Sequence, residues 1–350
     1  MTRPSGPLRI GLLGAGFVSG HHLAAWRRHA PRAQVLAIAD PHLERAADRA
    51  RSFGVPRVYT SAEALIEAGD LDAIDIASQR ETHPSLVRLA MSRGLAVLCQ
   101  KPLAPTYEEA VALVRDVRGK ARLMVHENWR FRPWYRQIGE WLRAGRIGNV
   151  VQAQMTLLSS GLLPDTRDVL PAVQRQPFLA DLERALVMEF AIHHIDTLRF
   201  LLGDLELMHA RLGKACTRTR GEDRVAAAFE TEDGTPVGLL ANLCVHGEPA
   251  ATVDRLLLVG ERGSIRLDGG TLSCEGEHPA RLEYDLDASY ADSYTGAIGH
   301  FIDALASGAE FETGPDDNLR TLQLVEEIYR RAGPAAGAGG RPVRVAGGAR

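Results

Sequence analysis

The order of the apolar runs in the first third of the chain is the feature that most constrains its fold. Between residues 8 and 128, short apolar runs alternate with segments of helical pattern. Strands joined by helices pair in parallel, and their right-handed crossovers cover both faces of the sheet with helices. Residues 1–125 are therefore predicted to form a doubly wound α/β domain. Its strands are expected at 8–13, 34–40, 71–78, 95–99 and 122–128, and its helices at 17–29, 41–54, 61–68, 83–94 and from Thr106 onward.

The rest of the chain follows a different order. Predicted strands succeed one another with turn residues between them, which favours antiparallel pairing. We predict an α+β domain at residues 126–332, built on a large, mostly antiparallel open sheet. A Gly/Ala-rich tail follows at 333–350, in which "RPVRV" has the pattern of a short edge strand. The strands are expected at 148–158, 205–212, 224–231, 236–245, 254–260, 263–267 and 281–285, and the helices at 134–145, 183–202, 291–306 and 316–331.

Charge and apolar content exclude two classes of protein. The net charge of −3 over 350 residues lacks the basic excess that nucleic-acid binding requires. No apolar run approaches the roughly 18 residues of a membrane span, and the first residues lead into a strand rather than a secretion signal. The four cysteines are too dispersed for a zinc site or a redox pair, which favours reduced thiols. We expect a cytoplasmic globular protein with neither a nucleic-acid nor a membrane partner.

A glycine turn closes the first predicted strand. Gly14 permits a tight turn, Gly16 lets the backbone approach a pyrophosphate, and Ser19 stands at the third glycine position of G-x-G-x-x-G. Asp40 ends the second strand about twenty residues later, where a carboxylate binds the ribose hydroxyls of NAD and repels the 2′-phosphate of NADP. The sequence therefore predicts a dinucleotide site that favours NAD, with NADP as the second choice. The alternatives are a plain tight turn, an Asp40 that only caps the next helix, and a methyltransferase that binds S-adenosylmethionine.

A lysine interrupts the end of a buried strand in "VLCQKPLAP", residues 97–105. Ligands of open α/β sheets bind beyond the carboxyl ends of the strands. Pro102 restricts the backbone of Lys101, so we expect the ammonium group to point into the cofactor crevice. A solvated lysine at a strand end is the alternative.

The apolar segment "RALVMEFAIHHIDTLRFLLG", residues 184–203, carries buried-looking ionisable side chains. In a helix, Glu189, His193 and either Asp196 or Thr197 lie on one face. Burying them is costly unless they are paired or act chemically. For His193, with a carboxylate one turn away, we favour an acid–base role. Hydrogen bonds between neighbouring helices are the alternative for Asp196 and His194. A metal site at Glu189 and His193 is not predicted, because no third ligand is evident.

These motifs together resemble the Gfo/Idh/MocA family, named for glucose–fructose oxidoreductase, inositol dehydrogenase and a rhizopine-catabolism protein. "GAGFVSGHH" resembles the family's G-x-G-x-x-x-x-x-H opening, with His22 at the histidine. "ASQRETHPSLVRLAMSRGLAVLCQKPLA" resembles its stretch ending in Glu-Lys-Pro, and "EFAIHHIDTLRFLLG" resembles D-x-G-x-H-x-x-D. "GHFIDALASGAEFETGPDDNLRTLQLVEEIYRRA" resembles its C-terminal helices. The resemblance covers nearly the whole chain and is specific for the family, not for a substrate.

The resemblance implies a Rossmann domain and an α/β domain whose open sheet forms the contacts of a homodimer or homotetramer. It implies reversible oxidation of a secondary hydroxyl of a sugar, cyclitol or related polyol by hydride transfer to NAD(P). It carries the catalytic lysine to Lys101, the catalytic histidine to His193, and the family's two aspartates to Glu189 and Asp196. The chain departs from the family at Gln100, where the family has Glu, and at Glu189. Neither change removes the proton-transfer pair.

The predicted mechanism places the substrate hydroxyl between Lys101 of one domain and His193 of the other. His193 takes the hydroxyl proton, Lys101 stabilises the developing alkoxide, and Glu189 orients the imidazole or binds a neighbouring hydroxyl. Packing at the domain junction is the alternative for "HENWRFRPWY", residues 126–135. The predicted substrate site comprises Lys101, Trp129, Arg130, Glu189, His193 and His194, and the predicted cofactor site comprises Gly14, Gly16, Phe17, Val18, Asp40, Ser78, Gln79, His83, Gln100 and Lys101.

Three other functions are compatible with the same resemblance. A glycosidase that retains NAD would oxidise its sugar only transiently, without net turnover of the cofactor. A non-catalytic NAD-binding regulator would share the fold, although the presence of both Lys101 and His193 counts against it. A reductase of aldehydes or imines would need the same hydride chemistry.

Overall fold

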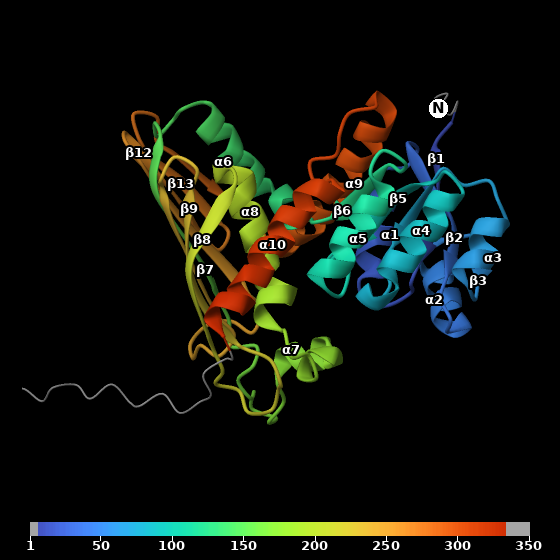
Figure 1. Ribbon diagram of the computed structural model, residues 1–350, viewed down its shortest axis with the longest axis horizontal. Coiled ribbons are helices and arrows are strands. Elements are labelled where there is room, and N and C mark those ends of the chain that lie inside the picture. Colours follow the sequence, from blue (N-terminus) through green and yellow to red (C-terminus); the bar gives the residue numbers. More distant parts are fainter. Residues whose placement is uncertain (1–5, 334–350) are drawn as a thin grey trace, which may run out of the picture. The chain divides into compact units, whose positions relative to one another are not determined.

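The structure is a computed structural model that describes residues 6–333 (Figure 1). The predicted tail strand "RPVRV" lies outside these residues. By their internal contacts, the described residues divide into two compact units. The first unit comprises residues up to Gly145, His193–Gly203 and Leu282–Leu324, and the second comprises Arg146–Ile192, Asp204–Arg281 and residues from Val325. Within 6–333, no helix combines the length and the apolar character that crossing a membrane requires.

The first unit is built on a parallel sheet of six strands in the order β3-β2-β1-β4-β5-β6. This arrangement confirms the predicted doubly wound sheet (Figure 1). Strand β3 was not predicted, because three residues are too few to show a pattern. The strands are β1 (Leu8–Leu13), β2 (Ala33–Ala39), β3 (Arg57–Tyr59), β4 (Ala73–Ile76), β5 (Ala96–Gln100) and β6 (Leu123–His126), and the helices between them are α1 (Ser19–Arg28), α2 (Leu43–Phe53), α3 (Ala62–Glu67), α4 (His83–Ser92), with the short η1 (Arg80–Thr82) before it, and α5 (Tyr107–Val117).

The core of this unit joins distant parts of the chain. The central strands are buried along their whole length, as expected of a sheet covered on both faces. Helix α9 (Leu286–Ser307) packs on the sheet beside α1, where Trp26 meets Phe301 edge to face at 6.2 Å. This apolar cluster explains why residues near the end of the chain belong to the first unit.

The second unit contains a sheet of eight strands in the order β14-β13-β12-β11-β7-β10-β9-β8. The ladders recorded for it are antiparallel except the parallel pair β7–β10, which confirms the predicted mostly antiparallel sheet. Buried and exposed side chains alternate along each long strand, so one face of the sheet is covered. The strands are β7 (Val150–Leu158), β8 (Leu205–Gly213), β9 (Arg224–Thr231), β10 (Pro236–Asn242), β11 (Val253–Gly260), β12 (Gly263–Asp268), β13 (Thr271–Gly276) and β14 (Ala280–Glu283).

Among the remaining helices, three short ones at residues 129–131, 171–175 and 177–180 were not predicted, and one predicted helix changes its type. The single helix expected at 183–202 begins as a π-helix, η4 (Val187–Ala191), and continues as α8 (Ile192–Leu202). The wider turn of a π-helix is often found at functional sites, and an apolar pattern does not distinguish it from an α-helix. The other helices are η2 (Trp129–Phe131), α6 (Pro133–Arg143), α7 (Pro171–Arg175), η3 (Pro177–Ala180) and α10 (Pro315–Ala332).

The compact units are not divided where the predicted domain boundary lies. A boundary at residue 125 cuts the chain once, whereas the first unit combines three segments of the chain. Residues 193–203 pack within the first unit, because Asp196 forms a bidentate ion pair with Arg130 and Arg199 binds Asp317. Lys101 and His193, expected from two domains, therefore belong to the same compact unit.

Candidate active site

The glycine turn leaves an open approach to the backbone at the end of β1. Gly14 has a φ of +101°, and a Cβ there would lie 2.7 Å from the carbonyl oxygen of Ala77, so only glycine fits without strain. Gly16 faces open space within 4 Å of its Cβ position. Phe17 is exposed, and Val18 precedes the first turn of α1. The turn and helix N-terminus thus fit the pyrophosphate of a dinucleotide.

Asp40 lies beside this turn, at the end of β2. Its Oδ2 accepts a hydrogen bond from the N–H of Ala15 at 2.8 Å, and its Oδ1 accepts one from the N–H of His42 at 2.8 Å. The carboxylate therefore holds both the glycine turn and the backbone just before α2. These contacts are compatible with the further acceptance of ribose hydroxyls, since each carboxylate oxygen has two lone pairs.

Strands β5 and β6 end side by side and place two charged residues together. Gln100 pairs with His126 in the parallel register, so Lys101 and Glu127 are the first residues beyond the two strand ends. Glu127 is fully buried, and burial raises the pKa of its carboxyl to about 7, while the charge of Lys101 acts to lower it. The Lys101 side chain therefore lies within electrostatic reach of Glu127.

The imidazole of His193 joins this cluster from α8. Its Nδ1 contacts Oε1 of Glu127, and its ring stacks on Trp129 with centroids 4.7 Å apart and planes 17° from parallel. The guanidinium carbon of Arg132 lies 3.8 Å from the centroid of the Trp129 ring, in a cation–π contact. His193 is only 9% exposed. The structure thus brings Lys101, Glu127 and His193 together at the carboxyl ends of parallel strands.

A buried polar network lies directly beneath Lys101. Asp75 Oδ2 is 2.8 Å from Nδ1 of His22, and Gln100 Nε2 is 2.9 Å from Nε2 of His22 and 3.4 Å from Nδ1 of His126. The Oε1 of Gln100 accepts the N–H of Lys101 at 2.9 Å. Because an amide nitrogen only donates, the imidazole nitrogens that face it must accept. Gln100 therefore fixes the backbone at Lys101, and these contacts support a positioning role more than direct cofactor contact.

Arg130 and Asp196 pair with each other. Nε and Nη2 of Arg130 donate to the two oxygens of Asp196 at 2.7 and 2.6 Å, and Nη2 also donates to Asp317 at 2.9 Å. The Nη1 of Arg130 donates to the carbonyl of Glu312 at 3.1 Å. Burial raises the pKa of Asp196 to about 6, opposed by the guanidinium. These bonds support a structural role for Arg130 rather than the predicted substrate contact.

The predicted residues at the end of β4 are mixed in their exposure. His83 is buried, with Nδ1 2.9 Å from the carbonyl of Pro102 and Nε2 3.2 Å from that of Ser78. It therefore braces the backbone next to Lys101, and burial lowers its pKa. Gln79 is exposed, and the hydroxyl of Ser78 lies 2.7 Å from that of Thr82. Of these residues, Gln79 and Ser78 remain the better candidates for cofactor contact.

Glu189 and His194 are the remaining predicted substrate residues. Glu189 lies half-buried on the π-helix, which belongs to the second compact unit, and His194 is buried on α8. The π-helix is anchored by Glu222, whose carboxylate accepts the N–H groups of Ala185 and Val187 at 3.3 and 3.0 Å. Glu222 thus holds the π-helix in place just before His193 in the chain.

Glu127 is the site residue that the sequence motifs missed. The available signal was its position directly after the last predicted parallel strand, where polar residues face the ligand side of the sheet. Residues 6–333 hold no group of three or more His, Cys, Asp or Glu side chains arranged for a metal ion.

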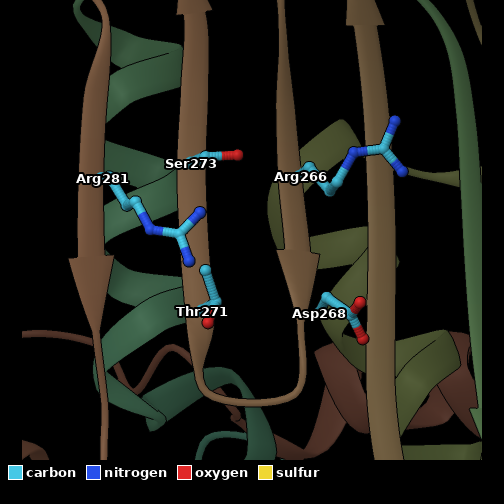
Figure 2. A pocket seen from close by; sticks show the side chains of 5 residues that line it. All are labelled: Arg266, Asp268, Thr271, Ser273 and Arg281. Atoms are coloured by element: carbon cyan, nitrogen blue, oxygen red, sulfur yellow. The ribbon is translucent and has the colours of Figure 1, made fainter.

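A separate depression of about 210 Å³ lies on the second sheet (Figure 2). Arg281 extends there towards Thr271 and Ser273, whereas Arg266 extends away from them, on the side of Asp268 (Figure 2). These residues belong to the second compact unit, whereas Lys101 and His193 belong to the first. Its polar lining lacks the apolar walls usual in small-molecule sites, so it is not the candidate active site.

The parallel sheet and its glycine turn define a dinucleotide-binding α/β protein. Residues 8–127 match the family model described as "Oxidoreductase family, NAD-binding Rossmann fold", and residues 135–266 match the "GFO/IDH/MocA C-terminal domain". The chain belongs to the Gfo/Idh/MocA oxidoreductase family. It is an NAD-dependent oxidoreductase.

Among similar proteins, a D-apiose dehydrogenase of Paraburkholderia graminis is 33% identical over 92% of this chain and 86% of its own length. Inositol 2-dehydrogenase 3 of Saccharopolyspora erythraea is 28% identical over 86% of each chain. A crystal structure of an oxidoreductase from Agrobacterium radiobacter in complex with NAD+, L-tartaric acid and magnesium has a TM-score of 0.85 at 28% identity, covering 93% of this chain and 96% of that one.

Proposed function

We propose that this protein reversibly oxidises a secondary hydroxyl of a sugar, cyclitol or related polyol, with NAD as the hydride acceptor. The observation that carries the proposal is the grouping of Lys101 and His193 around Glu127 at the carboxyl ends of β5 and β6. Ligands of open parallel sheets bind at that edge. The similarity to D-apiose and inositol 2-dehydrogenases favours a polyhydroxylated substrate.

The glycine turn and Asp40 would hold the cofactor. The N–H groups at Gly16, Phe17 and Val18 would bind the pyrophosphate, and Asp40 would accept the ribose hydroxyls. When bound, NAD supplies the hydride-accepting nicotinamide carbon. A carboxylate at residue 40 disfavours the extra phosphate of NADP by charge repulsion.

Lys101 and His193 would divide the work on the substrate hydroxyl. His193 accepts the hydroxyl proton as a general base, a role typically worth 10²–10⁴-fold in rate. The ammonium of Lys101 stabilises the negative charge that develops on the same oxygen. The stacked ring of Trp129 fixes the imidazole plane.

The test is the reduction of NAD by purified protein across a panel of cyclitols, aldoses and keto-sugars, followed at the absorbance band of reduced nicotinamide. We expect turnover with at least one polyol and a preference for NAD over NADP. Binding of NAD without reduction by any polyol would contradict the proposal and favour a regulator. Hydrolysis of a glycoside without net NADH would favour the glycosidase alternative.

We also propose a homo-oligomer in the cytoplasm, assembled through the open face of the second sheet. Leu240 on β10 is 43% exposed, and Ala226 and Ala228 on the neighbouring strand β9 are exposed beside it. An apolar strip of small residues suits the close approach of a second sheet. All four cysteines are free thiols, which is usual in a reducing compartment.

A further inference from the structure

We infer that Glu127 is the positioning residue of the base: it holds the proton of His193 on Nδ1 and so leaves Nε2 to accept the substrate proton. The inference rests on the proposed function and extends it. The family motif supplies its carboxylate four residues before the histidine, at Glu189, and assigns nothing to Glu127. Here the carboxylate that contacts the imidazole is Glu127, at the end of β6.

Two contacts restrict the rotation of the His193 imidazole. Glu127 holds one edge of the ring at Nδ1, and Trp129 covers one of its faces. The carbonyl of His193 also accepts the hydroxyl of Thr197 at 2.8 Å within α8. An ionised carboxylate beside Nδ1, the form that Glu127 takes above a pH of about 7, favours the tautomer with the proton on that nitrogen, which leaves the lone pair on Nε2.

The surroundings of Glu127 explain why the contact is more than packing. Glu127 is fully buried, and within the described residues its Oε2 has no hydrogen-bond partner. Leaving a carboxylate oxygen buried and unpaired is costly, so such a group is retained where it serves a function. The ionisable groups that act on Glu127 or are acted on by it are Lys101 on the end of β5, Arg130 on η2, His194, Asp196 and the contacted His193 on α8, and Tyr294 on α9.

The charge of Glu127 matters most during proton transfer. The carbinol carbon loses a hydride to NAD+, and the hydroxyl proton passes to Nε2 of His193, which gives a carbonyl product, NADH and an imidazolium. The imidazolium then carries protons on both nitrogens, with Nδ1–H still donated to Glu127. An adjacent carboxylate stabilises this cation, as the acid of a catalytic triad does.

The inference predicts how His193 titrates. A carboxylate in contact with an imidazole stabilises its protonated form, so removing the negative charge makes the ring lose its proton at lower pH. Glu127→Gln removes the charge with nearly the same shape. We expect His193 to titrate lower by roughly one pH unit or more in this variant, and kcat/KM to fall by about 10²-fold or more while the Kd of NAD is unchanged.

The experiment is a pH titration of the histidine side chains by ¹H–¹⁵N NMR in the protein without substrate. The resonance of His193 is assigned by its absence from His193→Asn. The matched control is Glu140→Gln on α6, an exposed carboxylate that accepts a hydrogen bond from Gln137, and it should leave the titration of His193 unchanged. The pH profile of kcat/KM is measured on the same proteins.

Each outcome decides one question. Identical titration of His193 in the wild type and Glu127→Gln overturns the inference, whatever the activity. A shifted titration with unchanged kcat/KM overturns the catalytic part. Wild-type protein without dehydrogenase activity overturns the proposed function instead, because the titration needs no substrate. If Glu127→Gln does not fold, Glu127→Asp, which withdraws the carboxylate by one methylene, should shift the titration in the same direction, and no shift would count against Glu127.

Discussion

Among the individual residues of the site, hydrogen-bond direction matters as much as charge. Gln100 donates from one amide nitrogen towards two imidazoles and accepts the backbone N–H of Lys101. The two contacts with the imidazoles require an amide, because an ionised carboxylate cannot donate, whereas the backbone N–H of Lys101 could be accepted by either group. The replacement of the family's glutamate by Gln100 is therefore consistent with two buried imidazoles that accept. Burial lowers the pKa of His126 well below its usual value, which favours the same neutral state.

Gln100→Glu tests this arrangement. The new carboxylate faces Nε2 of His22 and Nδ1 of His126, so a proton must be taken up or the contacts are lost. We expect a loss of about 1–3 kcal/mol in the free energy of unfolding at neutral pH, measured with urea. The control Gln152→Glu, at an exposed position of β7, should change the value by no more than about 0.5 kcal/mol. An equally stable Gln100→Glu variant would contradict the direction assigned to these hydrogen bonds.

Glu127 makes stability depend on pH. Its pKa is raised by burial to about 7 in the folded protein, so the folded state binds its proton more tightly than the unfolded state does. The stabilising contribution is full below the unfolded value near 4.5 and is lost as the pH rises through about 7. Between pH 4.5 and 8 the wild type should lose on the order of 3 kcal/mol relative to Glu127→Gln. The free energy of unfolding is measured with urea at each pH. Equal pH dependence of this free energy in the two proteins would refute the prediction.

The candidate site could be predicted only where the signal is local in sequence. Gly14, Gly16 and Lys101 belong to short motifs beside predicted strands, so their positions followed from the sequence. The contact of Glu127 with His193 joins residues 66 positions apart, and no spacing rule reveals it. Arg130 was assigned to the substrate because its ion pair with Asp196, also 66 positions away, cannot be recognised from the sequence. Long-range pairs of this kind require the fold.

At the scale of the elements, side-chain hydrogen bonds hold two segments of the site in place. The glycine turn is held by Asp40, and the π-helix before His193 is held by Glu222. Neither arrangement follows from apolar periodicity: the first depends on a side chain from the next strand, and the second on a loop residue before β9. The sequence predicted the order of the strands well because alternation is a strong pattern. It missed β3, which has only three residues, and β13, whose sequence TLSCEG has little apolar character.

Asp40→Ala tests the support of the glycine turn. The variant loses the acceptor for the N–H of Ala15 and the expected acceptor for the ribose hydroxyls. We expect the Kd of NAD, measured by quenching of tryptophan fluorescence, to rise by about tenfold or more, since each lost charged hydrogen bond is worth about 1.5–3 kcal/mol. Discrimination against NADP should weaken in the same variant. Unchanged binding of both cofactors would show that Asp40 only shapes the chain.

Glu222→Ala tests the anchor of the π-helix. The carboxylate accepts the N–H groups of Ala185 and Val187 and the hydroxyl of Tyr329, the last at 2.7 Å. Its loss leaves buried donors unpaired, and we expect the free energy of unfolding to fall by about 3 kcal/mol. Tyr329→Phe removes one of these three bonds and also the acceptor of the Met188 N–H, and it should cost about 1–2 kcal/mol. Equal effects of the two variants would contradict the anchoring role.

In the whole molecule, the two sheets have different surroundings. The parallel sheet is buried on both faces, whereas the second sheet exposes one face with Leu240 among small residues. The family relationship and the fold were both evident from the sequence, because they depend on motifs distributed over the whole chain. The compact units were not, because α8 and α9 join the first unit through contacts that no local pattern records.

Leu240→Arg tests the proposed oligomer. A charge at the centre of the exposed apolar strip would be desolvated without a partner on association. We expect the variant to elute as a smaller species than the wild type in size-exclusion chromatography with light scattering, with an unchanged far-UV circular dichroism spectrum. The matched control Val111→Arg, at a 40% exposed position of α5 in the first unit, should leave the assembly intact. An unchanged oligomer in Leu240→Arg would place the interface elsewhere.

The most direct test of the central claim is the initial rate of NAD reduction by Lys101→Met and His193→Asn with the best polyol of the wild-type enzyme. If the ammonium and the imidazole act on the same hydroxyl, each variant loses about 10²-fold or more in kcat/KM while its Kd for NAD stays at the wild-type value. A variant that binds NAD normally and reduces it at the wild-type rate would contradict the claim.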